Sequence, residues 1–131
     1  LIVSPITIAL DEQFWIMQNE DKIDFPIRLT FSRVEQIESP NLHRIFIDNN
    51  SLKFPLLLRK WQEGDYFYPL GMQGRKKISK YFKDEKFTLI DKENAWLLCS
   101  GNQIVWVVGK RQDDRFKILP STSKILKIEL Q

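Results

Sequence analysis

Two neighbouring apolar runs constrain the fold of this chain more than any other part of its sequence. Residues 95–100 read AWLLCS and residues 104–108 read IVWVV, with Gly101 and Asn102 in the turn between them. Apolar runs of this length favour strands, and a turn of this chemistry joins two strands as a hairpin. Residues 104–108 contain no polar side chain, so we expect this strand to be covered on both faces.

Further short strands are predicted along most of the chain. In residues 26–32, Ile27, Leu29 and Phe31 alternate with polar side chains, which is the pattern of a half-buried strand. Residues 122–130 suit a strand or a short helix equally well. The other strand candidates are residues 1–3, 6–9, 14–17, 44–48, 54–60, 95–100 and 115–119.

The spacing of apolar residues changes to that of a helix from Arg75 onward. Ile78, Tyr81 and Phe82 fall at i, i+3 and i+4, which predicts an amphipathic helix of about three turns. Another face of this helix carries Lys76, Lys80 and Lys83. Strands and helix together predict a mainly β (α+β) fold, a small antiparallel barrel-like sheet with one or two helices inserted.

Length and charge limit the class of protein. The 131 residues suffice for one domain, and no apolar run approaches the ~18 residues of a membrane span. Residues 1–52 hold four basic and eight acidic residues, a net charge of −4, whereas residues 53–131 hold sixteen and nine, a net charge of +7. The basic half predicts a polyanionic partner such as nucleic acid. Because the chain begins at Leu1 rather than Met, we expect a piece of a longer protein.

Few residues are suited to catalysis or metal binding. One histidine, His43, has no partner for a proton relay, and the single Cys99 lies in an apolar strand, which indicates a buried, inert thiol. Asp113 and Asp114 are interpreted as a solvated turn rather than as metal ligands. The chain has no G-x-S-x-G elbow and no Walker-type phosphate loop. We therefore expect no catalytic residue, no metal site and no cofactor in this chain, and a reducing, cytoplasmic setting.

A glycine turn before the basic helix is the most suggestive local feature. Gly71 and Gly74 allow a tight bend, and the lysines that follow could run along a nucleic-acid backbone. A solvated helix face after a glycine turn is an equal alternative. The nearby aromatic residues Phe67, Tyr68, Tyr81 and Phe82 could stack on bases. Core packing is the simpler interpretation for Tyr81 and Phe82, and for three of the four tryptophans, Trp61, Trp96 and Trp106.

A longer pattern goes beyond these local features. Residues 56–83 and 104–118 closely resemble the C-terminal region of bacterial tRNA(Ile)-lysidine synthases. The matching residues are, in order, Arg59, Trp61, Gly64, Asp65, Pro69, Gly71, Met72, Gly74, Lys76, Lys77, Ser79, Trp106, Gly109, Arg115 and Phe116. The resemblance implies that residues 1–131 form a single C-terminal tRNA-binding module, with lead-in strands over residues 1–53 and a motif-bearing core over residues 54–131. It also implies a barrel-like fold similar to a domain of the phenylalanyl-tRNA synthetase β-subunit.

The resemblance further implies an activity for the full-length protein. Enzymes of this family attach lysine to the wobble cytidine of tRNA(Ile), by ATP-dependent adenylation of the base followed by attack of the lysine amine. ATP, Mg²⁺ and L-lysine are therefore implied for the whole protein. The phosphate loop of the family's N-terminal ATP-pyrophosphatase domain does not occur in this chain, so we expect this chain to be catalytically silent. Its expected partners are tRNA(Ile), its own catalytic domain and, as an open alternative, a second copy of itself; no membrane partner is expected.

Basic residues near the motif are the candidates for contact with tRNA phosphates. They are Arg59, Lys60, Arg75, Lys76, Lys77, Lys80 and Lys83, with a second group of Lys110, Arg111 and Arg115. Structural roles are expected for Trp61, Gly64, Asp65, Pro69, Gly71, Gly74, Trp106 and Gly109, with the Asp65 carboxylate accepting backbone N–H bonds in a turn. Many family members carry an arginine-rich segment after the helix, where this chain has residues 89–94 (LIDKEN). The alternative function is a structural domain that packs on the catalytic domain or on a second subunit.

Overall fold

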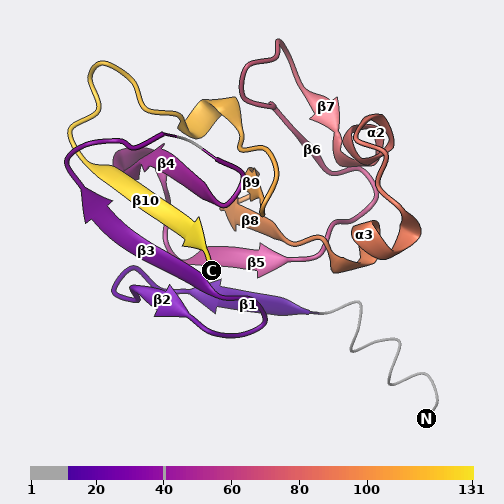
Figure 1. Ribbon diagram of the computed structural model, residues 1–131, viewed down its shortest axis with the longest axis horizontal. Helices are drawn as coiled ribbons and strands as arrows, with labels where there is room; N and C mark the ends of the chain where they lie inside the picture. Colours follow the sequence, from indigo (N-terminus) through magenta and orange to yellow (C-terminus); the bar gives the residue numbers. More distant parts are fainter. Residues whose placement is uncertain (1–11, 40) are drawn as a thin grey trace.

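Two four-stranded antiparallel sheets form most of the fold (Figure 1). The computed structural model describes residues 12–39 and 41–131. The first sheet has the order β1-β5-β8-β9, with β1 Gln13–Ile16, β5 Leu56–Arg59, β8 Leu97–Ser100 and β9 Gln103–Val107. The second has the order β2-β3-β10-β4, with β2 Lys22–Ile23, β3 Leu29–Val34, β10 Ile125–Leu130 and β4 Arg44–Asp48. The predicted strand candidates at residues 1–3 and 6–9 lie outside the described residues.

A smaller element stands beside the first sheet. β6 Tyr66–Phe67 pairs with β7 Lys76–Lys77 as a two-stranded ribbon, and two helices, α2 Ile78–Asp84 and α3 Leu89–Asn94, follow it. Thr88 caps α3 in a capping box, since its hydroxyl accepts from Asp91 N–H and the Asp91 carboxylate accepts from Thr88 N–H. Short 3₁₀ turns occur at η1 Asn49–Ser51 and η2 Asp114–Phe116. Of the helices described, none is long and apolar enough to cross a membrane. The predicted mainly β fold with inserted helices is confirmed.

The first hydrophobic core lies between the two sheets. The first sheet supplies Leu56 and Leu58 from β5 and Leu98 from β8, and the second supplies Phe31 from β3 and Ile128 from β10. All five side chains are buried. Burial of this many aliphatic and aromatic side chains is the main favourable term in folding, at roughly 1.5–3 kcal/mol for each.

A second core covers the opposite face of the first sheet. Leu97 and Cys99 of β8 pack there against Ile78, Tyr81 and Phe82 of α2. Alternate residues of β8 therefore enter different cores, because successive side chains of a strand point to opposite faces. The first sheet is consequently the middle layer, with the second sheet on one side and α2 on the other. This arrangement confirms the expectation that the strand in residues 104–108 is covered on both faces.

Several sequence predictions hold closely. The strand predicted at residues 44–48 is β4, and the predicted hairpin at residues 95–108 is the β8–β9 pair. Residues 122–130, which suited either element, contain a strand, β10. The core positions expected for Tyr81, Phe82, Trp96 and Trp106 are confirmed, while Trp61 is half-buried at the edge of the second core.

One predicted element is shorter than expected, and another is wrong. The basic helix begins at Ile78 rather than near Arg75 and has seven residues, because Lys76 and Lys77 pair with β6 as a strand. Residues 115–119 do not form a strand. Asp113 caps a 3₁₀ turn there, accepting a hydrogen bond from Arg115 N–H at 2.7 Å.

The second core predicts the effect of shortening Phe82. Its ring is fully buried, stacks on Phe87 at 4.6 Å between centroids and meets Trp61 edge-on at 5.3 Å. Phe82→Ala should lower the free energy of unfolding by about 3–5 kcal/mol, through lost burial and the cavity left behind. Leu89→Ala, at a side chain that is 71% exposed, should change it by less than about 0.5 kcal/mol. Urea denaturation of both variants measures the difference, and equal effects would contradict this core.

The same core predicts an unreactive thiol. Cys99 is buried, as interpreted from the sequence, and burial raises its pKa to about 11. At pH 8 roughly one thiol in a thousand is then ionised, against about one in ten at an unperturbed pKa of 9.0. Alkylation by iodoacetamide should be at least about a hundredfold slower in the folded chain than in urea. Equal rates in the two states would mean that α2 leaves this face of the sheet uncovered.

Candidate nucleic-acid interface

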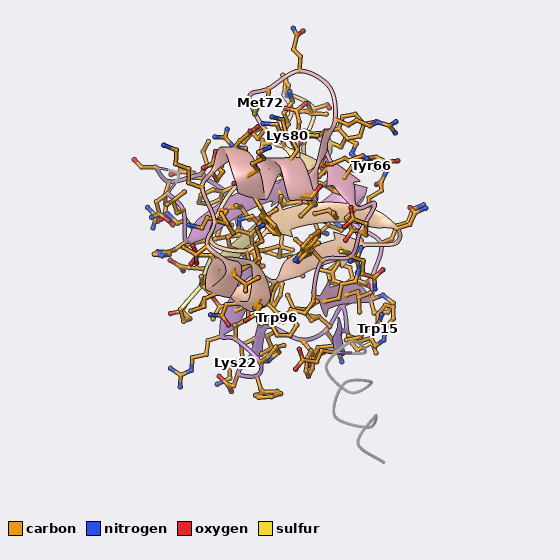
Figure 2. The ribbon with its side chains drawn as sticks, turned by 90° about the vertical axis from the view of Figure 1, so that its right-hand side faces the viewer. Trp15, Lys22, Tyr66, Met72, Lys80 and Trp96 are labelled. Atoms are coloured by element: carbon orange, nitrogen blue, oxygen red, sulfur yellow. The ribbon has the colours of Figure 1, made fainter. Side chains whose placement is uncertain are left out.

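Basic side chains gather on the outer side of α2 and on the ribbon beside it. Because Ile78, Tyr81 and Phe82 face the sheet, the remaining side chains of α2 face solvent, and Figure 2 shows Lys80 on this outer side. We call four exposed cations the helical basic face: Arg75, Lys77, Lys80 and Lys83. The stretch from residue 75 to residue 83 holds no acidic residue, so this surface is positively charged.

One carboxylate moderates the charge of this surface. Asp84 accepts from Lys76 Nζ at 2.6 Å and from Lys80 Nζ at 3.1 Å. These two hydrogen bonds, first from Lys76 and then from Lys80, lower the pKa of the Asp84 carboxyl group. The Lys76 side chain is only 20% exposed, whereas that of Lys80 is 61% exposed. Lys76 therefore serves chiefly to tie β7 to the end of α2, and Lys80 keeps most of its surface for solvent or a ligand.

The predicted second group of cations is divided by the fold. Lys110 Nζ lies 5.3 Å from the ring centre of Phe87, and Arg111 donates to the Leu70 carbonyl at 2.9 Å. Both are exposed and lie near α2, since they line one hollow together with Tyr81. Arg115 is instead held by Asp113, and its guanidinium lies over the ring of Tyr68 at 4.3 Å.

Two of the predicted phosphate contacts are bound inside the fold. Arg59 forms a bidentate pair with Asp65, with N–O distances of 2.9 and 3.0 Å, and this hydrogen bonding raises the pKa of Arg59. Lys60 Nζ donates to the Glu93 carbonyl and lies 4.2 Å from the ring centre of Trp96. Burial lowers the pKa of the Lys60 ammonium group. Both cations stabilise the end of β5, and they are not included in the basic surface.

Asp65 organises the turn that precedes the ribbon. Its carboxylate accepts from Gln62 N–H at 2.7 Å as well as from Arg59, and its carbonyl accepts from Ile78 N–H at 2.9 Å. The expected role of Asp65 as an acceptor of backbone N–H bonds is therefore confirmed. The first helical N–H of α2 is already satisfied by this contact, and the glycine turn at Gly71 and Gly74 leads into β7 rather than directly into the helix.

Asp113 is the second carboxylate that organises the site, and its interpretation as part of a solvated turn is wrong. The residue is fully buried. Its carboxylate accepts from the N–H groups of Tyr68 at 2.9 Å and Arg115 at 2.7 Å, and from the Arg115 guanidinium at 3.0 and 2.9 Å. Four donors compensate the loss of water, as a buried charge requires. Asp113 thereby joins the segment after β6 to η2.

Tyr66 is a surface residue that the sequence interpretation missed. The sequence directed attention to Phe67, Tyr68, Tyr81 and Phe82, of which all but Tyr68 are buried. Tyr66 is 41% exposed, and Arg75 lies over its ring with its Cζ atom 4.6 Å from the centroid. Figure 2 places Tyr66 on the same side of the molecule as Lys80. The sequence does contain a signal for the exposure of Tyr66. Successive side chains of a strand point to opposite faces, so that Tyr66 must point outward when Phe67 points inward.

A hollow of about 490 Å³ lies between the loop before β4 and the loop after β9. Its walls are apolar at Ile45, Phe46 and Ile118, and Lys110 and Arg111 also line it. Gln112 lines it as well, and its buried Nε2 has no hydrogen-bond partner among the described residues. Because Glu38 and Glu85 line it too, the hollow combines apolar walls with basic, acidic and amide groups.

Residues 56–129 match a family model described as the TilS substrate C-terminal domain. The chain is 53% identical to the tRNA(Ile)-lysidine synthase of Parabacteroides distasonis over 105 residues, which covers 77% of this chain and 24% of that protein. It is 46% identical to the synthase of Bacteroides thetaiotaomicron over 79 residues, covering 60% of this chain and 18% of that protein. The chain thus spans about a quarter or less of the length of these relatives.

A solved structure shares the fold. It is titled as the crystal structure of the TILS C-terminal domain and aligns with a TM-score of 0.75 over 92% of this chain and 97% of that one. The sequences are 17% identical in this alignment, so the match supports the arrangement of sheets and helices.

The buried carboxylate of Asp113 gives a sharp prediction. Asp113→Ala removes the acceptor for four donors and should lower the free energy of unfolding by about 3–5 kcal/mol. The neighbouring Asp114→Ala is the matched control, because its carboxylate contacts Lys117 at the surface at 3.2 Å, and it should cost less than about 1 kcal/mol. Thermal and urea unfolding of the two variants measure this difference, and a similar small loss in both would contradict the role given to Asp113.

Proposed function

The chain belongs to the TilS substrate C-terminal domain family, and from this premise we propose that it is the tRNA-binding C-terminal module of a tRNA(Ile)-lysidine synthase. The observation that carries the proposal is the helical basic face, defined above as Arg75, Lys77, Lys80 and Lys83. Exposed ammonium and guanidinium groups on one surface attract a phosphate backbone and release its counterions. Lys110 and Arg111 extend this surface beyond α2.

The surface is suited to the shape and charge of RNA rather than to its sequence. Lys80 and Lys83 are three residues apart in α2, which spans about 4.5 Å along the helix axis at about 1.5 Å per residue. Lys77 ends strand β7 just before this helix. A surface of this length contacts a few phosphates and sets the position of the RNA without reading base edges. Such a contact can hold a tRNA while the chemistry takes place elsewhere in the same enzyme.

For the whole protein we propose the activity named for its relatives. The rest of that enzyme would adenylate the wobble cytidine of tRNA(Ile) with ATP and Mg²⁺, and the amine of L-lysine would then displace the adenylate. This chain would act in that cytoplasmic enzyme by holding the substrate tRNA. Its partners would be tRNA(Ile) and the catalytic domain, and a homodimer is a further proposal.

A second candidate function is supported by a different surface. Trp15, Met17 and Phe25 are 54%, 49% and 71% exposed, and Figure 2 shows Trp15 at the opposite end of the molecule from Lys80. Trp15 and Phe25 line one hollow, and large exposed apolar side chains that lie together mark interaction surfaces. Under this candidate the domain packs on the catalytic domain through this surface, and the isolated chain has no affinity for RNA.

Charge reversal on the helical basic face tests the proposal. Lys77→Glu, Lys80→Glu and Lys83→Glu together should weaken tRNA binding and reduce the slope of log affinity against log salt by about two to three, since each lost phosphate contact removes about 0.7–0.9. Fluorescence anisotropy with labelled tRNA at several salt concentrations measures both quantities.

The control keeps the same net charge. Lys22→Glu, Lys53→Glu and Lys124→Glu change three other exposed lysines, and Figure 2 shows Lys22 far from Lys80. This variant should keep most of the affinity and nearly the whole salt slope. If the two triple variants lose affinity equally, binding follows net charge and not this surface. If the unmodified chain binds no tRNA at low salt, the second candidate function is favoured.

A further inference from the structure

Two tyrosines and two arginines form a continuous surface cluster beside the helical basic face. Arg75 Cζ lies 4.6 Å from the ring centroid of Tyr66, the rings of Tyr66 and Tyr68 meet edge-on at 6.3 Å, and Arg115 Cζ lies 4.3 Å from the ring centroid of Tyr68. We call these four residues the Tyr–Arg stack. The tyrosines lie on the same side of the β6 segment because Phe67 between them points into the second core.

The arginines at the two ends of the Tyr–Arg stack differ in whether they pair with a carboxylate. At one end, Arg115 is held by the buried carboxylate of Asp113 through two hydrogen bonds. At the other end, Arg75 is exposed and forms no salt bridge with the described residues. Its guanidinium lies over an aromatic ring instead of pairing with a carboxylate. The Arg75 end therefore keeps its hydrogen-bond donors for a ligand, whereas the Arg115 end is part of the fold.

Tyr66 has no packing role that would explain its position. Its side chain is 41% exposed and belongs to neither hydrophobic core. What it contacts is the Arg75 guanidinium and the edge of Tyr68. A ring in this position supports the arginine side chain and restricts the directions in which it extends, which lowers the entropy that Arg75 would lose on binding a ligand.

A small polar hollow adjoins the same ring. Its volume is about 250 Å³. It is lined by Tyr66, Arg115 and two amide-bearing residues, Asn102 in the β8–β9 turn and Gln103 at the start of β9, together with Gly64, Asp65 and Ile104. Amide side chains can both donate and accept hydrogen bonds along the edge of a base. The hollow is smaller than the roughly 300–1,000 Å³ of a typical drug-sized ligand site, which suits a single planar group.

We propose that Tyr66 and Arg75 bind one unpaired nucleotide of the RNA, with the base stacked on the Tyr–Arg stack and the phosphate on the Arg75 guanidinium. Unpaired bases stack on aromatic rings and on guanidinium planes, and guanidinium N–H groups bind phosphate oxygens. Paired bases cannot reach such a platform because they are stacked within their own helix. This inference rests on the proposed function and adds a preference for RNA with an unpaired nucleotide next to a duplex.

The test separates stacking from charge. Arg75→Lys keeps the positive charge and removes the planar group, and Tyr66→Leu keeps an apolar side chain and removes the ring, whereas Tyr66→Phe keeps the ring. The probes are an RNA hairpin with a single unpaired 2-aminopurine nucleotide at its 3′ end and the same hairpin with a blunt end. Stacking of 2-aminopurine quenches its fluorescence, so binding and stacking are read separately.

For the unmodified chain we expect tighter binding of the overhang hairpin than of the blunt one, with quenching on binding. Arg75→Lys and Tyr66→Leu should each weaken overhang binding by roughly fivefold or more, the low end of the effect of losing one base–aromatic contact, and abolish quenching. Tyr66→Phe should behave like the unmodified chain. Binding of the blunt hairpin and the salt slope should stay within about twofold in the two Tyr66 variants, because phosphate contacts alone determine them. Arg28→Lys, at an exposed arginine of the β2–β3 loop, is the matched control and should change neither quantity.

Each outcome has one meaning. Quenching that persists in Arg75→Lys and Tyr66→Leu overturns the platform and leaves the proposed tRNA-binding function in place. If the unmodified chain binds both hairpins equally and the fluorescence is not quenched, the platform is likewise overturned and the proposed tRNA-binding function stays in place. Absence of binding to either hairpin at low salt overturns the proposed function and the platform together. Thermal unfolding of each variant establishes that it is folded, and Arg75→Lys keeps the test valid if Tyr66→Leu is unstable.

Discussion

The first sheet has apolar side chains on both faces, and water must be kept from both of them. Successive residues of β8 point into different cores. Leu98 packs in the core between the two sheets, whereas Leu97 and Cys99 pack in the core beneath α2. A helix that covers a sheet in this way can bury only one of its own faces. The cationic residues of α2 are therefore on its solvent side by necessity, and their arrangement follows from the position of Ile78, Tyr81 and Phe82 on the sheet.

Two carboxylates divide the basic residues of the chain into structural and surface groups. Asp65 binds Arg59 and holds the start of α2, while Asp113 binds Arg115 and the backbone at Tyr68. These pairs fix the segments that flank the ribbon. They also occupy the guanidinium groups of Arg59 and Arg115, which the sequence analysis had given as candidates for phosphate contact. The residues left exposed are fewer than the sequence suggested, but they lie on adjoining elements. Acidic residues thus decide which of the basic side chains stay exposed at this surface.

The sequence was informative where a pattern is local and less so where a distant segment decides the structure. The period of two in β3 and the apolar runs of β8 and β9 predict strands because the pattern and the element share the same residues. Lys76 and Lys77 continue a helical pattern, yet they pair with Phe67 and Tyr66, nine and eleven residues away in the chain. The burial of Asp113 depends on a donor at Tyr68, which no local pattern indicates. The exposure of Tyr66 follows from the burial of its neighbour Phe67, which the sequence interpretation had placed among the candidates for stacking on bases.

The place of β10 in the second sheet has a consequence for how the domain forms during synthesis. β10 lies between β3 and β4, although it follows both of them by more than 75 residues in the chain. The two earlier strands have no direct pairing with each other, so neither can complete its hydrogen bonds until the ribosome has released the chain through Leu130. Pairings between such distant segments are slow to form, because the loop must close before any contact compensates its entropy. A truncated polypeptide would expose apolar strands to quality-control proteases, and completion of β10 would therefore mark a fully synthesised domain.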